Sequence, residues 1–203
     1  MPQLVTGIAG AMRMSKAAAE SSWQNGWYRS AQQIESPNCD ARPVNALIDL
    51  VVIHAISLPP GMFGGDGVAQ LFTNQLDPAA HPYYAEIAGL KVSAHFFIRR
   101  DGQLIQFVPI TARAWHAGVS TWEGRERCND FSVGIELEGD DDTPFAPAQY
   151  ATLHGLLAAL MHVLPLRAVT SHAHVAPGRK TDPGPHFDWT MVRTVCPDLQ
   201  VIP

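Results

Sequence analysis

The run Leu47–Ile53 is apolar at every position except Asp49, and it is rich in β-branched side chains. A run of this length and composition predicts a central strand that is buried on both faces. Such a strand needs a covering layer on each side, because neither face shows the polar alternation of a sheet exposed to solvent. The chain is therefore expected to fold as a layered domain with this strand near its centre.

The other patterned segments mix strands and helices without strict alternation, which is typical of an α+β or mixed three-layer domain. Segment 147–164 is the clearest helix, because Tyr150 and several leucines recur in it at intervals of three and four residues. Asp101-Gly102 is typical of a hairpin turn. We expect further strands at 93–99, 104–108, 131–137 and 167–170, and further helices at 68–74 and 187–195.

One domain accounts for most of the 203 residues. Residues 1–24 are rich in Ala, Ser and Met without a sustained amphipathic period, so we expect an N-terminal arm followed by a domain at 25–203. The formal net charge of −5 lacks the basic excess of nucleic-acid binders. No apolar stretch reaches the ~20 residues of a membrane-spanning helix, so neither nucleic acid nor membrane is an expected partner. No feature of the sequence indicates an oligomeric state.

The three cysteines, Cys39, Cys128 and Cys196, are far apart and odd in number. A disulfide framework is therefore not expected, and the protein is expected to reside in a reducing compartment. The first apolar stretch precedes Arg13 and Lys16, which reverses the charge order of a secretory signal. These features predict a cytoplasmic protein.

Candidate chemistry concentrates in His54, which follows the buried strand, and in the turn-rich segment 171–184. Catalytic zinc is typically held by three protein ligands that leave one position open. His54, Asp182 and one of His172 and His174 would supply two imidazoles and a carboxylate. The spacing leaves open which of the two histidines takes part, and it also allows a metal-free site built on His and Lys.

At these residues the chain resembles the zinc-dependent N-acetylmuramoyl-L-alanine amidases of the AmpD type. These cytoplasmic enzymes cut anhydromuropeptides during cell-wall recycling. Their fold, a central mixed β-sheet flanked by helices in one domain, is shared with peptidoglycan recognition proteins. The resemblance runs from about Trp27 to Trp189 and is carried by separate strings at Val52–Gly61, Val92–His95, Arg113–Gly118, Gly124–Ser132, Gly134–Gly139 and Arg179–Pro185.

The resemblance implies one Zn²⁺ ion and a role for several residues of this chain. It makes His54, His172 and Asp182 the zinc ligands. Glu136 is implied as the acid/base group and Lys180 as a neighbour of the reacting carbonyl. Glu138 lies on the same predicted strand face as Glu136, so alternation alone does not separate the two. Substrate contacts are implied at four positions: Ala55, Lys91, Trp115 and Arg127.

The chain departs from the family pattern at three positions. Ala55 stands where close relatives carry Asn, so a polar substrate contact is expected to be missing or replaced. Lys91 stands where Arg is usual, which keeps the charge but loses the bidentate fork. His174 stands where Asp is common. Among aromatic residues, Trp115 and Trp122 are candidates for a sugar-binding platform, and a place in the core fits either one equally.

The expected substrate is a small, soluble anhydromuropeptide whose amide bond between the lactyl group of muramic acid and L-alanine is cut. Two other functions are weighed against it. A peptidoglycan-recognition module would bind such fragments without cutting them, but these modules commonly lack a complete ligand set. An amidase of the intact cell wall would require export.

Overall fold

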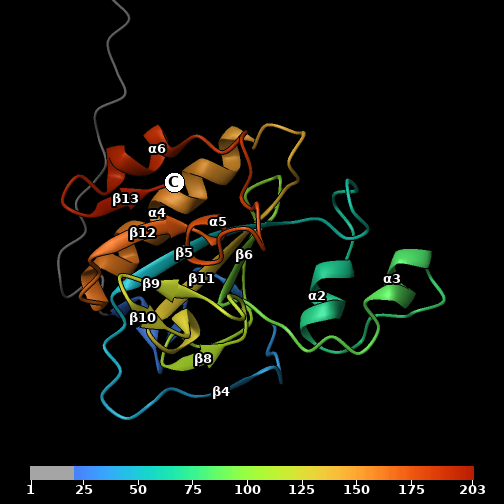
Figure 1. Cartoon of the computed structure of the whole chain (residues 1–203), viewed down its shortest axis with the longest axis horizontal. Helices are drawn as coiled ribbons and strands as arrows, with labels where there is room; N and C mark the ends of the chain where they lie inside the picture. Colours follow the sequence, from blue (N-terminus) through green and yellow to red (C-terminus); the bar gives the residue numbers. More distant parts are fainter. Residues whose placement is uncertain (1–20) are drawn as a thin grey trace, which may run out of the picture.

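The computed structural model describes residues 21–203, and a seven-stranded sheet forms its centre (Figure 1). The strand order is β13-β12-β5-β11-β6-β7-β3. The three long central strands, β12, β5 and β11, are parallel to one another, whereas β6 and β7 form an antiparallel hairpin. The sheet is thus mixed, as expected. Its strands are β3 (Gln32–Gln33), β5 (Leu50–Ile56), β6 (Phe96–Ile98), β7 (Leu104–Gln106), β11 (Ser132–Glu138), β12 (Ala168–Ser171) and β13 (Gln200–Ile202).

Helix α4 (Pro147–Val163) covers one face of this sheet together with α6 (Trp189–Val195), as Figure 1 shows. The apolar stripe of α4, which includes Leu153 and Leu157, packs against alternate residues of β5 and β11 such as Ile53 and Ile135. This packing fixes which residues of each strand face α4. The residues between them, among them His54 and Glu136, therefore point to the opposite face.

The opposite face is covered by short elements and loops. They are two two-stranded pairs, a 3-10 helix and three short helices, with α2 and α3 set apart from the sheet at the right of Figure 1. The pairs are β4 (Cys39–Ala41) with β8 (Ala112–Ala114), and β9 (Thr121–Trp122) with β10 (Arg125–Glu126). A third pair, β1 (Trp23–Gln24) with β2 (Trp27–Tyr28), packs instead against the apolar cluster on the α4 side of the sheet. The helices are α2 (Gly67–Phe72), α3 (Pro82–Glu86), η1 (Cys128–Asp130) and α5 (His172–Val175).

The predicted central strand exists, but it begins at Leu50 and continues to Ile56 instead of spanning 47–53. Leu47 is 55% exposed, and the buried carboxylate of Asp49 pairs with Arg125 just before the strand begins. The expected helices near 68–74, 147–164 and 187–195 are present, each one or two residues shorter, and α2 begins one residue earlier than expected. The sequence did not predict α3, β13 or the many two-residue strands.

Most of the expected N-terminal arm, residues 1–20, lies outside the described part of the chain. Folded structure already includes Trp23 and Gln24 in β1, two residues before the boundary that we expected at 25. Trp23 packs edge-on against Phe96 of the sheet, with ring centroids 6.3 Å apart. Among residues 21–203, no helix is long and apolar enough to cross a membrane.

Candidate active site

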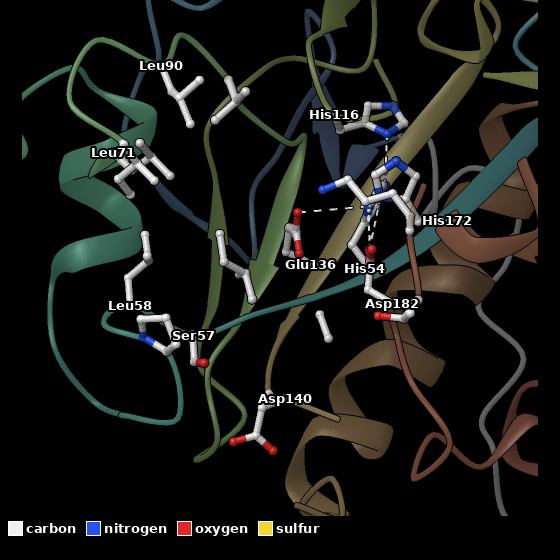
Figure 2. Close-up of a pocket in the computed structure, with 18 of the residues that line it drawn as sticks. His54, Ser57, Leu58, Leu71, Leu90, His116, Glu136, Asp140, His172 and Asp182 are labelled. Atoms are coloured by element: carbon white, nitrogen blue, oxygen red, sulfur yellow. Dashed lines mark hydrogen bonds and ion pairs between the residues drawn. The ribbon is translucent and has the colours of Figure 1, made fainter. Parts of the chain in front are cut away.

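Three side chains from distant parts of the chain converge at the carboxyl end of the central strands (Figure 2). Nδ1 of His54 lies 2.9 Å from Nδ1 of His172. Oδ2 of Asp182 lies 3.1 Å from the first of these atoms and 3.0 Å from the second. Both histidines are almost fully buried, and the three ligand-type atoms form a compact triangle.

The parallel sheet brings these residues together. β12 runs beside β5 with Ser171 opposite Ile53, so the chain leaves β12 at the level of His54. The hydroxyl of Ser171 accepts the backbone N–H of His174 at 2.9 Å and thereby caps α5, whose first residue is His172. The N–H of Ala173 donates to the carbonyl of Asp182 at 3.0 Å, which closes the intervening loop. The polar segment 171–184 is therefore folded back on itself around the cluster.

The chemistry of the cluster fits a divalent cation. Nε2 of His172 lies 3.2 Å from the carbonyl oxygen of Ala117, which can only accept, so this nitrogen donates, and in the neutral imidazole tautomer that this contact selects Nδ1 carries the lone pair. Burial and the neighbouring His172 lower the pKa of His54 to about 4, so its imidazole is neutral at physiological pH. Burial opposes the ionisation of Asp182, but its contacts with His172 and His54 hold its pKa well below the ordinary value. Imidazole nitrogens with a free lone pair and an ionised carboxylate are the ligand states that a metal ion requires.

Glu136 lies beside this cluster on β11, directly opposite His54 in the strand register. Its Oε1 is 4.0 Å from Nδ1 of His54, and its buried Oε2 has no hydrogen-bond partner among the described residues. Burial, followed by the nearby charge of Asp182, raises its pKa well above the ordinary value, while Lys180 opposes the shift. A carboxyl group with a raised pKa and an unused oxygen is suited to proton transfer.

The cluster opens into a cavity of about 490 Å³. One wall carries the polar groups, including Glu136, His116 and Lys180. Figure 2 shows Leu58, Leu71 and Leu90 on the other side of the cavity, near α2 and away from the cluster. A hollow with convergent polar groups on one side and apolar side chains on the other is the usual form of a site for a small organic ligand.

The comparison with known families agrees with this geometry. A family profile described as N-acetylmuramoyl-L-alanine amidase matches residues 43–185, which include the three cluster residues and Glu136.

The chain belongs to this family.

Curated relatives within the amidase family match nearly the whole chain. The protein is 52% identical over 174 residues to the 1,6-anhydro-N-acetylmuramyl-L-alanine amidase AmpD of Escherichia coli K12, covering 85% of this chain and 95% of that one. It is 48% identical over 169 residues to the AmpD of Haemophilus influenzae, covering 82% and 92%.

Two solved amidase structures are similar to this chain in fold. The crystal structure of a selenomethionine derivative of AmpD is 52% identical and superposes with a TM-score of 0.82, over 85% of this chain and 97% of that one. The amidase AmiD of E. coli, in complex with anhydro-N-acetylmuramic acid-L-Ala-D-γ-Glu-L-Lys, is 30% identical with a TM-score of 0.54. That match covers 76% of this chain and 60% of AmiD. The α+β fold with a central mixed sheet is thus the amidase fold.

Most residues that the sequence singled out lie around the amidase cavity. Ala55, Trp115 and Lys180 line it together with the cluster and Glu136. Lys91 borders a second hollow of about 300 Å³, which shares Leu71, Ile87 and Leu90 with the first. Arg127 does not line either hollow; its exposed side chain pairs with Asp130 at 3.3 Å. Its contact with substrate stays a prediction.

Three alternatives that the sequence left open have structural answers. His172 and His174 lie on a short helix instead of alternating across a strand, and the exposed His174 is not in the cluster. Glu138 accepts hydrogen bonds from the backbone N–H groups of Gly64 and Arg100, at 2.6 and 2.9 Å. Its carboxylate therefore anchors a loop and is not part of the cluster. Trp122 is 1% exposed within an apolar cluster, so it is a core residue and not a sugar platform.

Sequence reasoning missed the apolar wall of the cavity. This wall includes Leu58 from the loop before α2, Leu71 from α2 and Tyr83 from α3. No functional signal in the sequence pointed to these residues. Their spacing cannot be told from that of ordinary core residues, since a cavity wall and a core both require apolar side chains.

Proposed function

We propose that this protein hydrolyses the amide bond between the lactyl group of 1,6-anhydro-N-acetylmuramic acid and L-alanine in small soluble muropeptides, using one zinc ion. The observation that carries the proposal is the triangle of His54, His172 and Asp182, which opens into a cavity beside Glu136. Curated AmpD relatives are named for this bond, and they match the chain over almost their full length.

The donor set suits zinc in type and in spacing. Catalytic zinc sites commonly use three protein ligands, such as two imidazoles and a carboxylate, and they leave the fourth position for water or substrate. Ligand atoms bonded at about 2.05 Å to a tetrahedral ion lie about 3.3 Å apart, and the contacts between the three ligand atoms here are 2.9, 3.0 and 3.1 Å. When bound, zinc lowers the pKa of a coordinated water to about 7 and polarises a carbonyl oxygen.

Glu136 acts first as the general base and then as the general acid of the reaction. Its carboxylate takes a proton from the attacking water, whose oxygen bonds to the carbonyl carbon of the lactyl group. The same carboxyl then gives that proton to the alanine nitrogen as the C–N bond breaks. The products are a lactyl carboxylate and a peptide with a free amino terminus. The side chain is placed for both transfers because it faces the cavity and has an oxygen without another partner.

Lys180 supplies positive charge where the carbonyl oxygen becomes negative. Its side chain lines the same cavity, and its charge acts on both His54 and Glu136. An ammonium group at this point stabilises an oxyanion more than it stabilises the neutral amide, and this difference lowers the barrier.

The remaining walls suit a fragment with a sugar and a peptide. We assign Trp115 to the sugar, because this residue lines the cavity and an indole ring has an apolar face. Lys91, on the adjoining smaller hollow, is placed for a carboxylate of the stem peptide. Ala55 lines the cavity without a polar group of its own, so any contact at that point is apolar.

The complete set of ligands, acid/base group and cation favours catalysis over a recognition module that only binds. We also infer a cytoplasmic enzyme acting on soluble fragments, since Cys39, Cys128 and Cys196 are all free, which suits a reducing compartment.

The deciding experiment is mass spectrometry of products from purified anhydromuramyl-tripeptide and from whole sacculi, with wild type and Glu136→Ala in parallel. Release of tripeptide from the soluble substrate by wild type alone is the expected result. Cleavage confined to sacculi would replace the proposal with a wall amidase. Binding without cleavage would replace it with a recognition module.

A further inference from the structure

A chain of hydrogen bonds leads from His54 into the protein, away from the other two ligands. Nε2 of His54 lies 2.9 Å from Nδ1 of His116, and Figure 2 shows His116 on the far side of His54 from Asp182. Nε2 of His116 lies 3.1 Å from Oγ of Ser132. This hydroxyl lies 2.6 Å from the carbonyl oxygen of Cys128, four residues earlier. Three side chains thus connect a ligand nitrogen to a backbone carbonyl.

The carbonyl at the end of the chain fixes the direction of every bond in it. A carbonyl only accepts, so the hydroxyl of Ser132 donates to Cys128 and accepts from Nε2 of His116. A neutral imidazole has one N–H, so Nδ1 of His116 carries a lone pair and accepts from Nε2 of His54. Nδ1 of His54 then has no proton, and its lone pair is directed to the cluster.

We propose that His116 is a positioning residue that fixes the tautomer and ring orientation of His54, so that Nδ1 offers its lone pair to the metal ion. The inference rests on the proposed function, because it assumes that the cluster holds zinc. Partners of this kind beyond the ligands typically change metal affinity by about 10- to 100-fold when they are removed.

Ala117, the residue after His116, orients the other histidine ligand, His172. The carbonyl of Ala117 accepts Nε2–H of His172, so two consecutive residues orient both imidazole ligands, one through its side chain and one through its backbone. Oδ1 of Asn129 accepts the N–H groups of His116 and Ala117 at 3.2 and 2.8 Å, which fixes this segment in place.

The ring of His116 also packs closely against β11 at Gly134. A methyl group built on Gly134 would clash with the ring of His116, so only glycine allows the ring to lie this close to the strand. The rings of His54 and His116 meet edge to face, with centroids 5.0 Å apart and planes at 87°. A residue that only filled space would need neither this orientation nor a hydrogen-bond acceptor aimed at His54.

Two substitutions separate hydrogen bonding from packing. His116→Asn keeps an acceptor, because the amide oxygen of Asn can lie near the position of Nδ1 and accept from His54. His116→Leu fills similar volume without an acceptor. The dissociation constant for zinc, measured by competition with a chromophoric chelator, is expected to rise about 10- to 100-fold for His116→Leu and only a few-fold for His116→Asn. His162→Leu, an exposed residue at the end of α4, is the matched control and is expected to bind zinc as the wild type does.

A second readout needs neither metal nor substrate. Long-range ¹H–¹⁵N spectra of the metal-free wild type at pH 8 are expected to show the proton of His54 on Nε2. Circular dichroism reports whether each variant folds. If His116→Leu does not fold, Ser132→Ala replaces it, since this change removes the acceptor that orients His116; weaker zinc binding supports the proposal and unchanged binding overturns it.

The outcomes separate this inference from the proposed function. A wild type that fails to bind zinc overturns the proposed function. A wild type that binds zinc, together with a folded His116→Leu of equal affinity or a proton found on Nδ1 of His54, overturns the inference alone.

Discussion

Glu136 and Asp182 are two carboxyl groups of one site whose pKa values are displaced in opposite directions. Burial raises the pKa of Glu136, and the charge of Asp182 adds to this shift. The contacts of Asp182 with His172 and His54 outweigh its burial and hold its pKa low. Such a division suits Asp182 to permanent negative charge and Glu136 to the proton transfer that we propose for it.

This division predicts how stability depends on pH. A carboxyl whose pKa is raised in the folded state stabilises the fold below its unfolded pKa of 4.5, and that contribution is lost as pH rises through the folded pKa. Metal-free wild type should therefore lose melting temperature relative to Glu136→Gln between pH 5 and pH 8. Differential scanning fluorimetry across this range checks the result. The difference in melting temperature between the two proteins should become smaller when zinc is bound, because a cation favours the carboxylate. A difference that is the same at all pH values would contradict the assignment.

The same substitution should remove catalysis without removing the metal. Gln cannot take a proton from water, so Glu136→Gln is expected to lower kcat by about 10²- to 10⁴-fold. Elemental analysis should still find one zinc ion per chain, since Glu136 is not among the three cluster residues. Near-normal turnover would move the acid/base role to another group.

Zinc should stabilise the protein through its ligands. At a free zinc concentration of about 100 times the dissociation constant, binding adds about 2.7 kcal/mol, which corresponds to a rise of about 5–10 °C in Tm for a chain of this size. Chelation should reverse the rise and abolish amide cleavage. Asp182→Asn is expected to lose most of the rise, whereas His174→Ala should keep it, because His174 lies outside the cluster. Cleavage that survives complete metal removal would refute the zinc mechanism.

Lys180 should act on the rate of the chemical step. Loss of a group that stabilises an oxyanion typically costs about 10²- to 10³-fold in kcat. Lys180→Met keeps the length of the side chain without its charge, and it is expected to show this loss with a small change in KM. Lys180→Arg, which keeps the charge, should recover part of the rate. An effect confined to KM would make Lys180 a binding residue.

The two tryptophans at the centre of the sequence should behave differently. Trp122 is 1% exposed, so Trp122→Ala is expected to lower the free energy of unfolding by about 3–5 kcal/mol. Trp115 lines the cavity, so Trp115→Ala should raise KM for anhydromuropeptides with little loss of Tm. Thermal unfolding and steady-state kinetics of both variants test this contrast, and equal losses of Tm would contradict it.

Sequence patterns predicted the elements with strong periodicity. The apolar run around Val51, the stripe of α4 and the alternation in β11 each reflect burial, which the sequence encodes directly. The three-residue strands β6 and β7 lie inside the expected ranges 93–99 and 104–108, whereas β13 and the two-residue strands were not predicted. The latter are too short to show a period and are defined by the strands with which they pair. The limits of β5 also shifted, since the salt bridge of Asp49 with Arg125 joins residues 76 apart in sequence.

The candidate site was predicted in composition but not in arrangement. Residue types and family resemblance pointed to His54, His172 and Asp182, which the structure brings together. The spacing alone could not choose His172 over His174, because the answer depends on a helix that begins at His172. The surroundings of Arg127 and Trp122 were equally out of reach, since exposure is a property of the packed chain.

The cavity has two walls of different origin. His54 and Glu136 lie on adjacent central strands, whereas Leu58, Leu71 and Tyr83 come from the peripheral segment that contains α2 and α3. Substitutions or a transplanted segment on the peripheral side can alter which fragment is accepted while the strands preserve the reactive geometry. Enzymes of this architecture can therefore diversify in what they select without rebuilding how they react.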